Sequence, residues 1–353
     1  MSASDAAEKR VRLGFCGCGW VVRHCYRPAL ARLQSDFDVT AVFDPAPVAR
    51  HFAAEAWPAA RYCATFDELL AVRPAALIVA SPNALHVDHA AVALAAGISC
   101  LVEKPAVRDT ADVARLLAAR KPGATLMSAV ASRYRRDTQA WLAAVSALGP
   151  LAALDLTWTR EQGVPATPWH LRRDGGWTGV FADLGYHLLD LAGAALHWPG
   201  ADIDVLSVRS ASQKQAVAAG WYRQTQAVAY DTDDRFEAAA AIGGCTLRIR
   251  VNWVDDEPGD LVRLAARAAR GEAVLEGLFG FSDNRRTAEQ RVLLRGDGAI
   301  RETHFPAGPQ LQLEAFENLL RDFHAAVRAG SAAIPPELTF VGRLAGALRA
   351  KNP

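Results

Sequence analysis

Residues 11–20 read Val-Arg-Leu-Gly-Phe-Cys-Gly-Cys-Gly-Trp, a short apolar run that ends in closely spaced glycines. A second apolar run, residues 39–43, ends in Asp44. Glycines at such a turn let the backbone approach a pyrophosphate, and the N-terminus of the following helix faces its charge. A carboxylate after the second strand accepts hydrogen bonds from ribose hydroxyls. This order of features predicts a dinucleotide-binding fold, and with it redox chemistry on a nicotinamide cofactor.

The first third of the chain alternates strand-like and helix-like segments. The predicted strands are residues 12–15, 39–43, 61–64, 76–81, 100–103 and 125–130, and the predicted helices lie near 20–34, 47–55, 66–72, 85–96 and 110–120. Thr65 and Glu68 have capping-box spacing, which indicates a helix start. Apolar strands alternating with helices predict a parallel sheet covered on both faces. Ligands of such sheets bind beyond the carboxyl ends of the strands.

The pattern changes after about residue 131. Strand-like runs follow at 151–159, 203–212, 226–230, 236–242, 246–253, 273–279 and 292–294, with helical stretches at 135–148, 183–197, 310–329 and 337–350. Strands without regular intervening helices indicate a mostly antiparallel sheet. We therefore predict an α/β Rossmann domain at 1–131 and an α+β domain with a large open sheet at 132–353, and leave open whether the last helices pack on the first domain.

Composition narrows the class of protein. The 353 residues carry a net charge of +1, so no overall basic field attracts nucleic acid or a membrane surface. The sequence has neither an apolar run of the roughly 18 residues that a span needs nor a hydrophobic signal core, which predicts a cytoplasmic protein. The six cysteines are expected to be reduced thiols. The spacing of Cys16, Cys18, His24 and Cys25 does not fit a zinc knuckle.

Two further stretches carry candidate chemistry. Lys104 follows a buried strand, where an ammonium group is costly unless it is paired or functional, although a strand-end lysine that reaches water fits the pattern equally well. Asp183 and His187 are four residues apart in a predicted helix, so that a carboxylate lies beside an imidazole as in a general base. The alternative is that Asp183 is a helix N-cap and His187 packs in the core.

With these motifs in their order, the chain resembles the Gfo/Idh/MocA family of nicotinamide-dependent oxidoreductases. The resemblance covers roughly residues 10–200 and depends on four motifs, which are Gly17-Cys18-Gly19-Trp20, Ser81-Pro82-Asn83-Ala84-Leu85-His86, Glu103-Lys104-Pro105 and Asp183-Leu184-Gly185-Tyr186-His187.

The resemblance implies three catalytic residues. Lys104 would sit beside the nicotinamide and hold the reacting oxygen of the substrate. His187 would be the general acid or base, and Asp183 would help to bind and orient. The reaction would move a hydride between the nicotinamide and a secondary alcohol or ketone of a sugar, cyclitol, aminosugar or related polyol.

The resemblance also implies the binding residues. The cofactor-binding set is Gly17, Gly19, Trp20, Val21, Asp44, Ser81, Asn83, His86 and Glu103. The resemblance places Arg133 between cofactor and substrate, and no metal is expected. Apart from the resemblance, Trp169 is predicted to stack on a sugar ring, the alternative being that this tryptophan serves the core or a subunit interface. Asp44 repels a 2′-phosphate and favours NAD, while nearby Arg50 leaves NADP open. Val22 replaces the last glycine of the fingerprint, which predicts a slightly displaced helix.

The sequence also leads to an expected oligomeric state and leaves two alternative functions open. In this family the open face of the second sheet commonly pairs with another subunit, so a homodimer or homotetramer is expected. One alternative activity is a glycoside hydrolase that uses NAD for transient oxidation. The other alternative is a non-catalytic nucleotide-sensing regulator, which would be expected to lack the lysine or the histidine.

Overall fold

The computed structural model describes residues 10–165, 168–173, 177–212, 217–218, 227–296, 298–331 and 333–351. These residues divide into two units. The first unit comprises the described residues up to Val107 together with Ala111–Ala131 and Leu313–Leu338. The second comprises Arg108–Thr110, the described part of Ser132–Gln312, and the chain from Thr339 onward.

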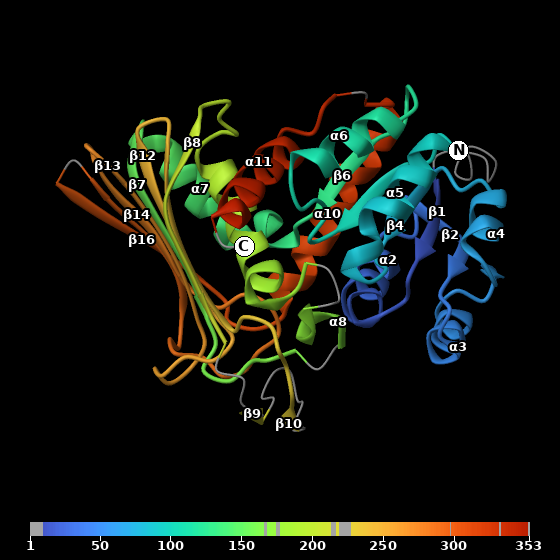
Figure 1. Ribbon diagram of the computed structural model, residues 1–353, viewed down its shortest axis with the longest axis horizontal. Coiled ribbons are helices and arrows are strands. Elements are labelled where there is room, and N and C mark those ends of the chain that lie inside the picture. Colours follow the sequence, from blue (N-terminus) through green and yellow to red (C-terminus); the bar gives the residue numbers. More distant parts are fainter. Residues whose placement is uncertain are drawn as a thin grey trace. The chain divides into compact units, whose positions relative to one another are not determined.

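A parallel six-stranded sheet forms the centre of the first unit (Figure 1). Its strand order is β3-β2-β1-β4-β5-β6, and all five neighbouring pairs are parallel. The strands are β1 (Val11–Cys16), β2 (Phe37–Phe43), β3 (Arg61–Cys63), β4 (Ala76–Val79), β5 (Ser99–Glu103) and β6 (Leu126–Ala129). Every residue of β4 and β5 is buried, as a sheet covered on both faces requires. The predicted parallel sheet is therefore confirmed.

The helices of this unit lie close to the predicted positions. They are α2 (Arg27–Ala31), α3 (Pro47–Ala56), α4 (Phe66–Ala71), α5 (His86–Ala95), α6 (Thr110–Ala119) and α10 (Gln310–Ala329). At the start of α4 the Glu68 amide donates to Thr65 Oγ1 at 3.2 Å, which confirms the cap. The helix expected near 20–34 begins instead as a π-helical segment, Val22–Tyr26, which continues into α2.

An eight-stranded sheet forms the second unit, in the order β16-β15-β14-β13-β7-β12-β11-β8. Only the β7–β12 pair is parallel, which confirms the mostly antiparallel prediction. The strands are β7 (Leu151–Thr159), β8 (Ile203–Ala211), β11 (Arg235–Ile242), β12 (Cys245–Asn252), β13 (Leu261–Ala268), β14 (Gly271–Gly277), β15 (Gln290–Gly296) and β16 (Ala299–Phe305), with a separate pair β9 (Val217–Ala218) and β10 (Ala227–Val228).

Helices cover one face of this sheet. The covering helices are α7 (Arg136–Leu148) and α9 (Tyr186–Ala195), which a π-helical segment (Phe181–Gly185) precedes, and the other helices of this part of the chain are α8 (Pro168–Leu171) and α11 (Pro336–Ala350). Helix α7 packs on β13, β14 and β15, and α9 packs on β7 (Figure 1). Strands β11 and β12 alternate buried and more exposed residues, as a sheet covered on one face should. Within the described residues no helix is long and apolar enough to cross a membrane.

Candidate functional site

The glycine turn after β1 has the shape that a phosphate-binding loop needs. Gly17 has a φ of +95°, and a Cβ there would lie 2.4 Å from the carbonyl oxygen of Ala80. Only glycine fits this position without displacing backbone. A Cβ on Gly19 would meet no atom within 4 Å. Gly19 therefore borders open space at the start of a helix, where a pyrophosphate would be accommodated.

Asp44 follows β2 and its carboxylate holds the glycine turn. Its Oδ2 accepts the backbone N–H of Cys18 at 2.7 Å, and its Oδ1 accepts that of Ala46 at 2.8 Å. An ionised carboxylate has about four acceptor sites, so these two bonds leave capacity for ribose hydroxyls. Trp20 and Val21 follow the turn and are half-buried, and the ring centroid of Trp20 lies 4.8 Å from that of His24.

His86 joins the ends of two neighbouring strands in the same unit. Its Nε2 lies 2.7 Å from the carbonyl oxygen of Ser81, and its Nδ1 lies 2.9 Å from that of Pro105. The side chain is buried, and burial lowers the pKa of His86, while both carbonyl contacts oppose this shift. His86 therefore fixes the turn after Lys104 to the end of β4. Asn83 lies in the short helical turn between them and is half-buried.

Glu103 is buried at the end of β5, with 5% of its surface exposed. Its Oε1 accepts the hydroxyl of Tyr26 at 2.7 Å, and its Oε2 accepts the backbone N–H of Lys104 at 3.1 Å. Burial raises the pKa of Glu103, and these contacts oppose the shift. Lys104 itself is half-buried, and its bond to Pro105 is cis. The carboxylate that precedes the lysine thus anchors the lysine backbone.

Asp183 lies within the π-helical segment that leads into α9, and the helix does not begin at this residue. The position before the segment is Val180, which makes no side-chain cap bond, so the N-cap interpretation of Asp183 is wrong. Asp183 is buried, and its Oδ2 accepts the indole N–H of Trp253 at 3.0 Å and lies 3.4 Å from the guanidinium of Arg160. Buried donors therefore fix the carboxylate in place.

His187 is half-buried, whereas its neighbours at 181–186 and 188–190 are buried. Its Nδ1 lies 3.0 Å from Oγ of Ser132, and its ring centroid lies 5.2 Å from that of Trp158. The sequence did not predict a role for Ser132. This serine lies in no recognisable motif, and it is 55 positions away from His187 in the chain.

Arg133 is the residue after that serine. Its Nε lies 3.4 Å from Oδ2 of Asp190, a fully buried carboxylate on α9 that the sequence also did not reveal. The guanidinium carbon lies 5.1 Å from the ring centroid of Trp198. Arg133 therefore fixes the turn to α9, and its contact with substrate stays a prediction.

The tryptophans of the second unit differ in exposure. Trp169 on α8 is 37% exposed, whereas Trp158, Trp177 and Trp253 are buried and belong to the core. Trp221 lies outside the described residues. Trp169 is therefore the tryptophan best placed to stack on a ligand from solvent.

The described part of the chain holds no cluster of three or more His, Cys, Asp or Glu side chains suited to a metal ion. The six cysteines are free and buried. Burial, together with the charge of Asp44, raises the pKa of Cys16 to about 12. Cys16 therefore behaves as a small apolar side chain rather than a thiolate ligand.

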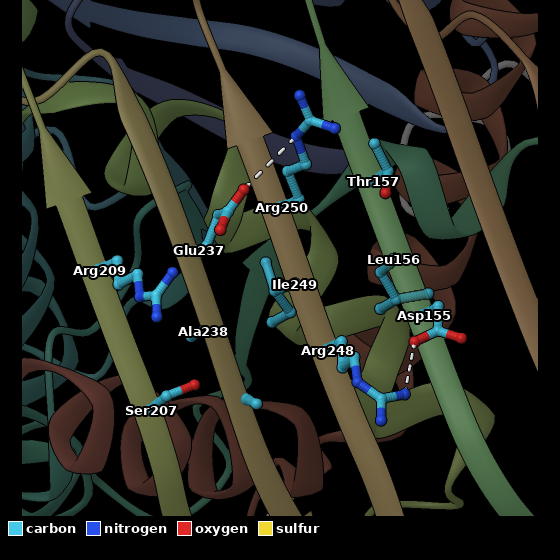
Figure 2. A pocket seen from close by; sticks show the side chains of 11 residues that line it. Asp155, Leu156, Thr157, Ser207, Arg209, Glu237, Ala238, Arg248, Ile249 and Arg250 are labelled. Carbon is cyan, nitrogen blue, oxygen red and sulfur yellow. Dashed lines mark hydrogen bonds and ion pairs between the residues drawn. The ribbon is translucent and has the colours of Figure 1, made fainter.

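A polar pocket of about 460 Å³ lies on the face of the second sheet opposite the buried side chains, across β8, β11, β12 and β7 (Figure 2). Arg209, Glu237 and Arg250 are paired cross-strand neighbours in one row. Glu237 lies 3.7 Å from Arg250, and Asp155 lies 3.1 Å from Arg248. Charges of both signs thus alternate along this surface, which we call the charged sheet face.

Comparison with known proteins places these features in context. Residues 11–129 match the model of an oxidoreductase family with an NAD-binding Rossmann fold. The putative UDP-kanosamine synthase oxidoreductase subunit of Amycolatopsis mediterranei (strain S699) is 34% identical over 281 residues, which cover 78% of this chain and 77% of that protein. D-glucoside 3-dehydrogenase of Escherichia coli (strain K12) is 34% identical over 135 residues, covering 37% of this chain and 38% of that protein.

A solved structure shares the fold. The 3-ketoreductase KijD10 from Actinomadura kijaniata, solved with NADP and TDP-benzene, superposes with a TM-score of 0.77 at 19% identity and covers 97% of each chain.

Proposed function

The chain belongs to the Gfo/Idh/MocA family of oxidoreductases, and on that premise we propose that it transfers a hydride between nicotinamide and a secondary alcohol or ketone of a sugar. The observation that carries the proposal is His187, a half-buried imidazole on an otherwise buried helical stretch whose Nδ1 lies against Ser132. An imidazole held at one nitrogen is oriented to exchange a proton at the other.

We propose that the first unit holds the cofactor. The glycine turn would receive the pyrophosphate and Asp44 the ribose hydroxyls, with Trp20, Val21, Ser81 and Asn83 along the cofactor. The bound nicotinamide supplies or takes up the hydride at its C4. His86 and Glu103 are buried and bonded to backbone, so we assign them to shaping this site around Lys104. The carboxylate of Asp44 favours NAD over NADP, because it opposes a 2′-phosphate.

The reaction itself would use two side chains that act on the reacting oxygen. Lys104 would donate to the reacting oxygen and stabilise the negative charge that develops there. His187 would give a proton to that oxygen in ketone reduction and take it back in alcohol oxidation. Asp183 is fixed by Trp253 and Arg160, and a fixed carboxylate aligns substrate hydroxyls at low entropic cost.

The names of the relatives narrow the substrate. A 3-dehydrogenase, a 3-ketoreductase solved with a TDP derivative and an oxidoreductase subunit of a UDP-sugar synthase support carbon 3 of a nucleotide-linked or glycosidic hexose as the reacting carbon. Trp169 would stack on the sugar ring or the base, since its exposed indole offers an aromatic face to a ligand from solvent.

Turnover of 3-keto and 3-hydroxy hexoses, free and nucleotide-linked, tests the proposal through nicotinamide absorbance. Lys104→Ala should lower kcat/KM by about 10²–10³-fold, and His187→Gln by about 10²–10⁴-fold. Lys121→Ala and His51→Ala change an exposed lysine and an exposed histidine and serve as matched controls. Full activity of the Lys104 and His187 variants, or no turnover of any of these sugars by the unaltered protein, would exclude the proposed chemistry.

We also propose that two copies of the chain pair through the charged sheet face. Because its charges alternate in sign, a second copy can meet each charge with its opposite, and such pairs are screened by salt. Light scattering should show a dimer or tetramer at low salt that dissociates at about 1 M salt. Glu237→Lys should weaken the assembly, while Glu55→Lys on the first unit should not. A monomer at low salt would exclude this assembly.

A further inference from the structure

Ser132 lies in a short helical turn, Ala131–Tyr134, that follows β6, and only 1% of its surface is exposed. Its Oγ lies 3.0 Å from Nδ1 of His187, within hydrogen-bond distance. That Asp183 helps to orient this imidazole stays a prediction, and Asp183 Oδ2 accepts the indole N–H of Trp253. At Nδ1 the imidazole faces a neutral hydroxyl.

The same turn is fixed to the same helix at a second point. Arg133 follows Ser132, and its Nε lies 3.4 Å from Oδ2 of the buried Asp190. His187 and Asp190 are three residues apart on α9 and therefore lie on neighbouring positions of one helix face. The ring of Trp158 lies against the imidazole at 5.2 Å. Two consecutive residues of one turn thus set the position of the helix, and the imidazole is restrained on two sides.

We infer that Ser132 is a positioning residue whose Oγ accepts the Nδ1–H of His187 and so keeps Nε2 as the atom that exchanges a proton with the substrate. This inference rests on the proposed function. In ketone reduction the hydride reaches the carbonyl carbon while imidazolium Nε2 gives its proton to the oxygen. The neutral ring that remains retains its Nδ1–H on Ser132, and alcohol oxidation reverses each transfer.

A serine suits a base that must work in both directions. A carboxylate at Nδ1 would stabilise the imidazolium by its charge and hold the ring protonated at higher pH. A hydroxyl accepts the same hydrogen bond with no net charge, so it fixes the tautomer without adding a negative charge that would hold the ring protonated.

Nitrogen-15 NMR of the His187 ring in the cofactor-free full chain tests the inference without relying on turnover. The signal is assigned by its loss in His187→Gln. The neutral ring should carry its proton on Nδ1 in the unaltered protein. Ser132→Ala should shift the neutral ring towards the Nε2–H form and make it titrate at lower pH, and Ser132→Thr should restore the original state. Ser128→Ala removes another buried serine hydroxyl and should change neither property.

Kinetics supply the second readout. Ser132→Ala should lower kcat by about tenfold, the effect of one hydrogen bond, with little change in KM, and should move the pH–kcat profile to lower pH. An Nε2–H tautomer in the unaltered protein, or an unchanged tautomer and profile in Ser132→Ala, would overturn the inference. If the tautomer follows Ser132 but His187→Gln keeps full turnover, the proposed function fails and the positioning role fails with it, while the contact itself stands.

Discussion

Replacing Tyr26 by phenylalanine isolates the hydrogen bond that supports Glu103 and, through it, Lys104. The Tyr26 ring is fully buried between Phe15 and Phe316, so the substitution keeps these apolar contacts and removes only the hydroxyl. The lost bond is 2.7 Å long and reaches the buried Glu103 carboxylate, which also accepts the backbone N–H of Lys104. A hydrogen bond to a charged group contributes about 1.5–3 kcal/mol.

We therefore expect Tyr26→Phe to lower the free energy of unfolding by about 2 kcal/mol, which lowers the melting temperature by about 4–8 °C in a domain of this size. Calorimetry of the unaltered protein and the variant at pH 5 and pH 8 measures this loss of stability. The pKa of Glu103 is raised by burial, and the Tyr26 bond lowers it, so the variant raises it further. When a carboxyl group has a higher pKa in the folded than in the unfolded state, the free energy of unfolding of the protein falls as pH rises. The loss should therefore be larger at pH 8 than at pH 5.

Tyr62→Phe is the matched control. Its hydroxyl faces two neutral carbonyl oxygens, that of Ala53 at 2.9 Å and that of Trp57, and the side chain is half-buried. We expect a loss below about 1 kcal/mol that does not change between pH 5 and pH 8. A Tyr26→Phe loss no larger than that of the control, or one that shrinks as pH rises, would refute the assignment of a buried charged acceptor.

Three further predictions concern the two units separately. Gly17→Ala should weaken NADH binding more than about tenfold, because a Cβ would collide with the backbone of Ala80. Gly123 has a similar φ but borders open space, so Gly123→Ala should leave NADH binding unchanged. Equal NADH affinity of the two variants would contradict this prediction. Asp44→Ser should raise the affinity for NADPH relative to NADH by about tenfold in a fluorescence titration, and an unchanged ratio would show that this carboxylate does not select the cofactor. Trp169→Ala should raise KM about five- to tenfold at unchanged kcat, and a fall in kcat alone would argue against stacking.

The sequence was most informative where local pattern and tertiary structure agree. The apolar strands of the first unit end in glycine, acid or lysine at the expected positions, because buried parallel strands admit few other residues. Strands β13 and β16 were missed for the opposite reason. The sequence of β13, Leu-Val-Arg-Leu-Ala-Ala-Arg-Ala, consists largely of good helix formers, and pairing with β7 and β14 overrides that preference. The seven residues of β16 are exposed or half-buried and show no apolar alternation.

Prediction of the candidate site from sequence was limited in a similar way, because some of its contacts join residues that are far apart in the chain. Lys104, Asp183 and His187 could be predicted as site residues because each lies in a recognisable motif. Ser132 and Asp190 were not, since their roles come from contacts with residues far away in the sequence. That Asp183 helps to orient His187 stays a prediction, whereas the contact between His187 Nδ1 and Ser132 Oγ had no signal in the sequence.

Deuterium transfer tests the central claim most directly. The protein is mixed with NADH that carries deuterium on the transferable position of C4 and with a 3-keto hexose, free or nucleotide-linked, and the product is analysed by mass spectrometry and NMR. The account predicts one deuterium on the carbon that was the ketone, and its near-absence with His187→Gln or Lys104→Ala at equal cofactor binding. Product without deuterium, or equal transfer by the two variants, would contradict hydride transfer by this site.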